Sequence, residues 1–148
     1  MTPQELLAIY RKNLESTIQE VTNFPDDTML WETAPGVLNS AGNLALHIAG
    51  NLRYFLGNEI AGTGYVRDRD AEFNTKGLSR SEVCDALRLA IADVELTLAN
   101  MPKEMLGNNY PLDRFGGVQT TGFVLTYLLA HLNYHLGQVN YLRRILAK

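Results

Sequence analysis

The fold is decided by the stretch LTYLLAHLNYHLGQVNYLRR, residues 125–144, in which apolar residues recur near the 3.6-residue period of an amphipathic helix. This spacing predicts a helix over residues 119–147, the longest in the chain. The two arginines near its end suit the negative pole of a helix. Its inner side is expected to contain Val124, Tyr127, Leu128, His131, Leu132, His135, Val139 and Leu142.

Three further helices follow from the same apolar spacing and from the positions of Pro and Gly. They are predicted over residues 3–23, 40–60 and 79–101. Thr2 is the expected N-cap of the first helix, with Pro3 at its first position. Ser79 and Glu82 have the spacing of a capping box, which marks the start of the third.

Four amphipathic helices bury their apolar stripes most simply in an all-α four-helix bundle. We therefore predict one domain over residues 1–148, a bundle with long connections after its second and third helices. These connections, residues 61–77 and 102–117, are polar and rich in turn-forming residues, and are predicted to be non-helical. Loops of that length in a compact domain often carry function.

Composition narrows the class of protein. With 148 residues, 46% of them hydrophobic and 20% charged, the chain has the size and content of one soluble domain. The formal net charge is -3, and the lysines and arginines are scattered, so we expect no nucleic-acid partner. No run approaches the roughly 18 uninterrupted apolar residues of a membrane span, so we also expect no membrane partner.

Two further features predict a cytoplasmic protein. The start of the chain, MTPQELLAIYRKNLES, lacks the apolar core of a secretory signal. The single cysteine, Cys84, cannot form an internal disulfide and is expected to be a buried, reduced thiol.

The three histidines of the chain have the number and spacing of a metal site. His131 and His135 are four residues apart on one helix, so they lie one turn apart on the same face. His47, from the second helix, would be the third ligand. Three protein ligands leave a position open, as in catalytic zinc sites, and nitrogen ligation suits zinc, nickel, copper or iron. The alternative is three ordinary core histidines.

Polar neighbours of the histidines are candidates for the surroundings of such a site. Asn43 and Asn51 lie one turn on either side of His47, and Gln138 shares the face of His131. Their amides could hydrogen-bond the imidazole nitrogens that do not face the ion, or simply link helices. Tyr54 and Tyr127 are possible donors to a bound ligand, or packing residues.

Two known metal-binding motifs are absent from the sequence, which excludes the enzyme classes that use them. Leu132 follows His131, so the HExxH metalloprotease motif is excluded, and the paired Glu-x-x-His motifs of dinuclear bundles are missing as well. No residue stands out as a general base. The connection after the second helix, residues 61–77, contains Arg67, Asp68, Arg69 and Asp70. These residues are expected to form a solvated ion-pair cluster, with an anion-binding or lid role as the alternative.

Two stretches, SAGNLALHIAGNLRYF at residues 40–55 and the one quoted first, resemble the DinB-like (YfiT-like) superfamily. The specific part of the resemblance is one histidine in the second helix and HxxxH in the fourth. It implies a four-helix bundle, commonly a homodimer, with nickel or zinc held by His47, His131 and His135. Characterised relatives include S-transferases that use bacillithiol or mycothiol and a mycothiol-dependent maleylpyruvate isomerase.

Three hypotheses follow from the residues and the resemblance together. The first is a metal-dependent enzyme acting on a small molecule, either a thiol S-transferase with a low-molecular-weight thiol cofactor or a hydrolase. The second is a noncatalytic dimeric module that binds a metal or small ligand. The third is a vestigial, empty triad. An open pocket of substrate size beside the histidines would favour the first hypothesis over the second.

Overall fold

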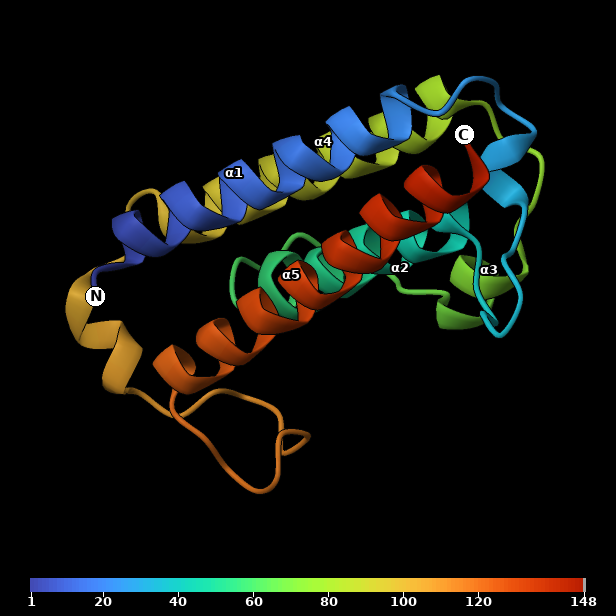
Figure 1. The fold of residues 1–148 in the computed structure, drawn as a ribbon. Coiled ribbons are helices and arrows are strands. Elements are labelled where there is room, and N and C mark those ends of the chain that lie inside the picture. Colours follow the sequence, from blue (N-terminus) through green and yellow to red (C-terminus); the bar gives the residue numbers. More distant parts are fainter. Residues whose placement is uncertain (148) are drawn as a thin grey trace.

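The computed structural model describes residues 1–147 and is all-helical, with no strand in that range apart from one isolated bridge between Asn109 and Thr120. Figure 1 shows its five α-helices. They are α1 (Pro3–Thr22), α2 (Ala41–Leu52), α3 (Arg69–Asn74), α4 (Arg80–Leu98) and α5 (Thr121–Leu146). The predicted all-α bundle is confirmed, since the four long helices are those expected from the apolar spacing.

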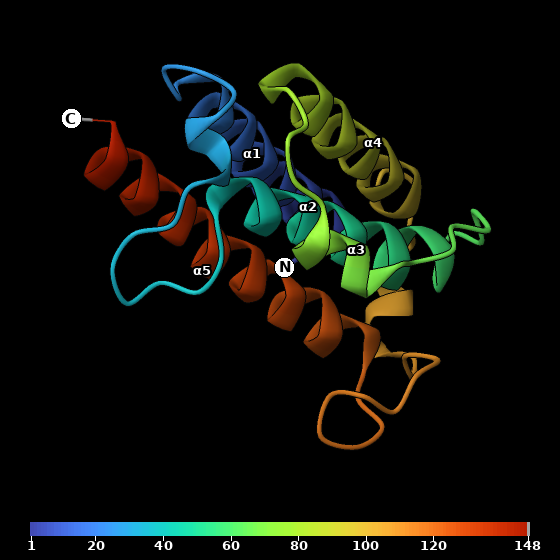
Figure 2. The ribbon, with the colours of Figure 1, turned by 90° about the vertical axis from the view of Figure 1, so that its right-hand side faces the viewer.

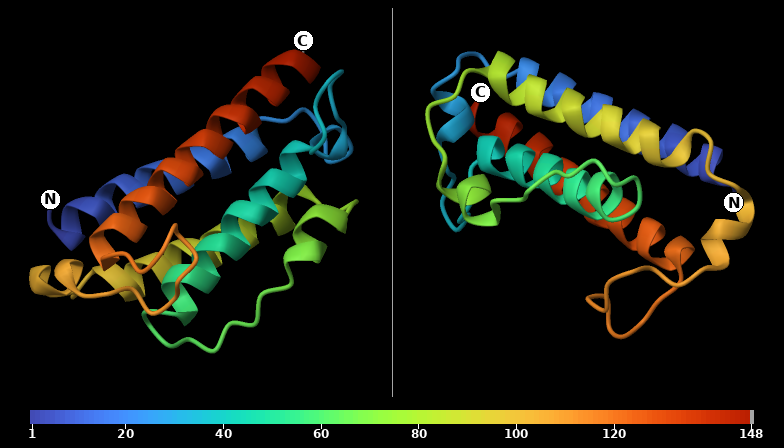
Figure 3. Two further views of the ribbon diagram at one scale, coloured as in Figure 1. Left: turned by 90° about the horizontal axis from the view of Figure 1, so that it is seen from below. Right: turned by 180° about the vertical axis from the view of Figure 1, so that it is seen from behind.

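The four long helices form two layers. In Figure 1, α1 and α4 lie side by side above the pair formed by α2 and α5. The view from behind in Figure 3 has the same arrangement, and α1 and α2 each contact both α4 and α5. None of the described helices is both long enough and apolar enough to cross a membrane.

Side-chain caps begin the helices where the sequence predicts them. The Thr2 and Ser79 hydroxyls each accept a hydrogen bond from a backbone N–H three residues later, and the glutamates there, Glu5 and Glu82, accept in return from the cap N–H. At the N-terminus of each of these two helices, two otherwise unpaired N–H groups are hydrogen-bonded. Each such cap stabilises the fold by roughly 1 kcal/mol.

The core lies between the two layers. Tyr10, Leu14, Ile48 and Leu128 are almost fully buried in it, and the Tyr10 hydroxyl donates to the backbone carbonyl of Leu125. That bond satisfies the one polar atom of a fully buried tyrosine and joins α1 to α5. Cys84 is a buried, free thiol as expected.

The connection after α2 differs from the prediction in one part. Residues 61–77 were predicted to be non-helical, but Arg69–Asn74 form α3, whose N-cap is the side chain of Asp68. Figure 2 shows this short helix lying against α2. The prediction was wrong here because six residues are too few for apolar periodicity, and this helix is stabilised by packing instead.

The end of the second predicted helix also changes form. After Leu52 the chain continues as a π-helical turn, Arg53–Asn58. Such turns are frequent at functional sites. The loop before α5 packs on this turn: the Tyr110 hydroxyl donates to the carbonyl of Phe55, and the Phe115 ring lies edge-on to the Phe55 ring. Figure 3, seen from below, shows this loop crossing toward the end of α2.

Candidate metal centre

The three histidines meet on the facing sides of α2 and α5. The Nε2 atom of His131 lies 3.3 Å from Nε2 of His47 and 3.0 Å from Nε2 of His135. One ligand atom from each of the three residues lies within 4.8 Å of the others. His47 is buried, whereas His131 and His135 are partly exposed. The helical spacing predicted this convergence of the HxxxH pair with a histidine from a second helix.

In two of these rings the outer nitrogen, Nδ1, which does not face the other histidines, is held by a hydrogen bond. Nδ1 of His47 lies 2.9 Å from Oε1 of Glu72, and Nδ1 of His135 lies 2.7 Å from Oε1 of Gln138. Both oxygens accept, so both Nδ1 atoms donate. The Nε2 atoms of these two rings then carry lone pairs when the rings are neutral.

Burial and nearby positive charge lower the pKa values of the two α5 histidines and favour their neutral form. Burial, followed by the nearby positive charges of His135 and His47 when protonated, lowers the pKa of His131 to about 4. The pKa of His135 is lowered as well, again mainly by burial. At neutral pH the α5 histidines therefore present unprotonated nitrogens.

This arrangement fits a metal ion. Lone pairs on His47 and His135 Nε2 point toward His131 Nε2, which has at most one proton and so cannot donate to both. A cation between the three nitrogens would remove that conflict. Nitrogens bound to one tetrahedral zinc are about 3.3 Å apart, close to the two separations found here.

Glu72 is the carboxylate behind the triad. Arg67 holds it with a two-point contact, in which Nε and Nη2 each donate to one oxygen over 2.9 Å. Burial alone would raise the pKa of Glu72, but hydrogen bonds from His47 and Arg67 outweigh burial and place that pKa below its usual value. Glu72 is therefore an ionised carboxylate that orients His47, as carboxylates commonly do for metal-binding histidines.

A glycine makes room for this carboxylate. Gly50 lies on α2 one turn after His47, and a Cβ atom built there would be 1.9 Å from Oε2 of Glu72. Any other residue would collide with the carboxylate. The absence of a side chain at Gly50 thus permits α3 to bring Glu72 against α2.

A protein-family model matches most of the chain, including the residues of this site. The model of the DinB superfamily matches residues 9–139, which include all three histidines, Glu72 and Gln138. The chain belongs to the DinB superfamily. Comparison with curated proteins gave no match.

The fold of this DinB superfamily member is also found in a solved structure. A DinB-like protein from Bacillus cereus is similar with a TM-score of 0.72 and 24% sequence identity, over 95% of this chain and 90% of the other. At that level of identity the likeness concerns the fold.

The amides predicted around the DinB histidine triad have different roles. Gln138 bonds His135, as described above. Asn43 does not bond an imidazole: its amide donates to the backbone carbonyls of Glu72 and Thr75, so it fastens α3 to α2. Asn51 is 6% exposed, and its Oδ1 has no hydrogen-bond partner in the described chain.

Of the two tyrosines, Tyr127 lines the pocket beside the triad and Tyr54 lines an adjoining hollow. Tyr127 was expected on the inner side of the last helix, but it is 53% exposed, so that prediction was wrong. Its ring is edge-on to Phe115, 5.5 Å away between centroids, because the preceding loop folds back over the start of α5. Tyr54 packs against Phe55 in the π-helical turn.

A pocket of about 280 Å³ opens beside the triad. His47, His131, Asn51 and Tyr127 line it, together with arginines from the α2–α3 connection and the loop before α5. Its size approaches the lower end of small-molecule sites. Through this pocket a small ligand can reach the open face of the triad.

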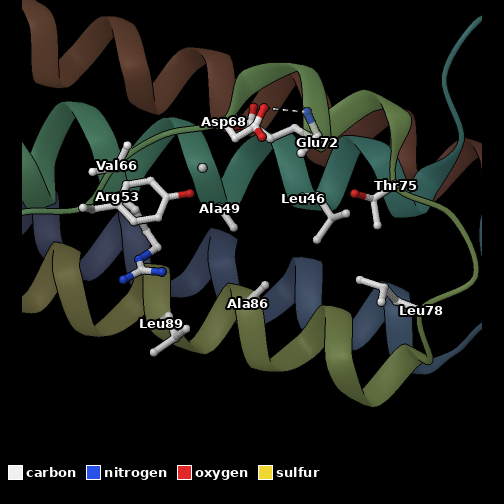
Figure 4. A pocket seen from close by; sticks show the side chains of 13 residues that line it. Leu46, Ala49, Arg53, Val66, Asp68, Glu72, Thr75, Leu78, Ala86 and Leu89 are labelled. Carbon is white, nitrogen blue, oxygen red and sulfur yellow. Dashed lines mark hydrogen bonds between the residues drawn. The ribbon is translucent and has the colours of Figure 1, made fainter.

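A second groove has Glu72 among its lining residues. Figure 4 shows it between α2, α3 and α4, lined by the apolar side chains of Leu46, Ala86 and Leu89. Its volume is about 260 Å³. It does not touch the histidines. We therefore place the candidate site in the pocket on the triad's side.

Sequence reasoning missed Glu72 and the pairing of Arg67 with it. The charged run that includes Arg67 was expected to be a solvated ion-pair cluster, but the Arg67 side chain is only 11% exposed and is paired with Glu72, so that expectation was wrong for this residue. One available signal was Gly50 beside His47, since a glycine inside a helix often marks a close approach by another segment.

Proposed function

We propose that this DinB superfamily member is an enzyme that depends on a divalent metal ion bound by His47, His131 and His135. One observation supports this most strongly. Three Nε2 atoms converge, while hydrogen bonds to Glu72 and Gln138 keep the protons of two rings on the outer nitrogens. Nickel and zinc are the ions we expect, because nitrogen ligation suits both.

We propose that the sulfur of a small thiol cofactor attacks an electrophilic substrate, loses its proton and forms a new S–C bond while the substrate's leaving group departs, with hydrolysis as the alternative. A divalent ion on three imidazoles keeps a position for an outside ligand and would lower the pKa of a thiol or water there. Thiol transfer is favoured because it needs no strong protein base. Glu72, the carboxylate that contacts the triad, is already held behind His47 by Arg67.

The activity is tested on protein reconstituted with zinc or nickel. Cysteine, glutathione and thioglycerol are each mixed with monochlorobimane, and conjugate fluorescence reports S-transfer. We expect a metal-dependent rate above background that is lost in His131→Ala. Cys84→Ser is the matched control, since Cys84 contacts α1 and not the triad. p-Nitrophenyl acetate tests hydrolysis in the same samples.

The second candidate is a noncatalytic dimeric module that binds a metal or small ligand. Full metal binding with background rates for every thiol and for the ester would favour it over the enzyme. The proposal of a homodimer is supported by one face of α5, which exposes Tyr134, Tyr141 and Ile145. Sedimentation that gives a monomer at micromolar concentration would contradict the dimer. A cytoplasmic location stays a prediction.

A further inference from the structure

The pocket beside the triad has a cationic wall. Arg67, Arg69 and Arg114 line it, and within residues 1–147 no aspartate or glutamate does. An adjoining hollow shares these three arginines and has Glu59 as its acidic member. In a chain of net charge -3, this is a local concentration of positive charge at the entrance to the histidines.

Two of these charges are not neutralised by the fold. Arg67 is paired with Glu72, whereas neither Arg69 nor Arg114 forms an ion pair with any residue of the described chain. A guanidinium group presents a planar set of donors that matches carboxylate and phosphate oxygens. The wall therefore offers two unengaged oxyanion-binding groups.

Aromatic rings hold both groups near the pocket. The Arg69 guanidinium lies 5.2 Å from the centre of the Phe73 ring, and that of Arg114 lies 5.9 Å from the centre of the Tyr54 ring. Phe73 in turn packs on His47, with 4.8 Å between ring centres. Cation–π contacts of this kind limit the freedom of the arginines before a ligand arrives.

A buried amide in the same pocket provides an independent observation. Asn51 lines the pocket, is more than nine-tenths buried, and its Oδ1 accepts no hydrogen bond from residues 1–147. A buried acceptor without a partner costs free energy unless a ligand or water supplies a donor. Its position indicates a ligand that also carries a polar hydrogen.

We propose that the pocket binds an oxyanionic small molecule, bearing a carboxylate or phosphate that Arg69 and Arg114 contact, with Asn51 accepting one of its polar hydrogens. The inference deepens the proposed function: the molecule's role as substrate rests on that function, but its binding does not require the metal. A recessed pocket of about 280 Å³ fits a small molecule, and the chain's net negative charge disfavours a polyanion.

Isothermal titration tests the proposal on the protein as purified, with metal content measured in the same sample. Succinate and glycerol 3-phosphate are the two oxyanion probes, and the neutral succinamide is the control ligand. We expect one or both anions to bind and succinamide not to bind. In the Arg69→Gln/Arg114→Gln variant the dissociation constant should rise at least about tenfold.

Arg144→Gln is the matched control variant, because Arg144 is also exposed and stacked on a tyrosine, but lies at the far end of α5. It should leave anion binding unchanged. Absence of binding by both anions, or equal affinity in the double variant, overturns the proposal. Arginine-dependent binding together with no metal uptake after reconstitution with zinc and nickel would contradict the proposed metal enzyme and leave the anion site standing.

Discussion

Nδ1 of His47 and Oε1 of Glu72 lie 2.9 Å apart, both buried, in residues separated by 25 positions. The contact joins α3 to α2 and fixes the orientation of the imidazole. Arg67 completes it by holding both oxygens of the same carboxylate. The chain thus has the histidine–carboxylate pair that tunes many metal sites.

Replacing Glu72 with Gln should weaken metal binding without removing it. The neutral amide keeps the shape of the side chain but no longer stabilises the His47 N–H with a negative charge. We expect the metal dissociation constant to rise about 10- to 100-fold, measured by competition with a chromophoric chelator. Glu95→Gln, at an exposed ion pair with Arg11, is the control. Equal affinities in wild type and Glu72→Gln would contradict this role.

Adding a methyl group at Gly50 should displace the carboxylate. The new Cβ would lie 1.9 Å from Glu72 Oε2, so α3 must shift or the carboxylate must turn away. We expect Gly50→Ala to lower the free energy of unfolding by about 1–3 kcal/mol and to weaken metal binding. Gly137→Ala is the control, because nothing lies within 4 Å of that position and alanine favours helix by roughly 0.5–1 kcal/mol. Urea denaturation that ranks the two variants in the opposite order would refute the argument.

The fold and the triad were predictable because their causes are local. Capping residues such as Ser79 and the four-residue spacing of His131 and His135 act within one helix, so they can be recognised without knowing the tertiary structure. His47 could be added because apolar stripes determine which helix faces meet.

The partners of the triad were not predictable in the same way. Glu72 reaches His47 only because α3, a six-residue helix with little periodicity of its own, is packed on α2. The helical spacing predicts that Tyr127 faces the core, yet its side chain is exposed. Its ring contacts Phe115 of the long loop before α5 instead of the other helices. Both depend on long-range packing of connections, for which the chain has no repeating pattern.

The buried amide of Asn51 should lower the free energy of unfolding and support ligand binding. Oδ1 has no partner in residues 1–147, so Asn51→Leu would remove an unsatisfied acceptor and fill a similar volume. We expect the free energy of unfolding to rise by about 1 kcal/mol in urea denaturation, while the affinity for glycerol 3-phosphate, whose hydroxyls can donate to Oδ1, falls. A variant less stable than wild type would contradict the description of Asn51 as an unsatisfied acceptor.

Acid should destabilise the metal-free protein. Burial, and then the charges of His135 and His47, lower the pKa of His131 from 6.5 to about 4 in the folded state. Between these values the unfolded chain binds more protons, so stability is fully present above pH 6.5 and is lost as the pH falls. We expect a loss of roughly 1–2 kcal/mol from pH 6.5 to 5 in urea denaturation. His131→Gln should flatten this dependence, and an unchanged slope would contradict the assignment.

The central claim is that His47, His131 and His135 hold one metal ion. Elemental analysis of the purified, tag-free protein beside the His131→Ala/His135→Ala variant tests it most directly. We predict about one nickel or zinc per chain in the wild type, and its loss in a variant that remains helical by circular dichroism. No metal in the wild type after reconstitution with zinc and nickel, or equal metal in both proteins, would contradict the claim.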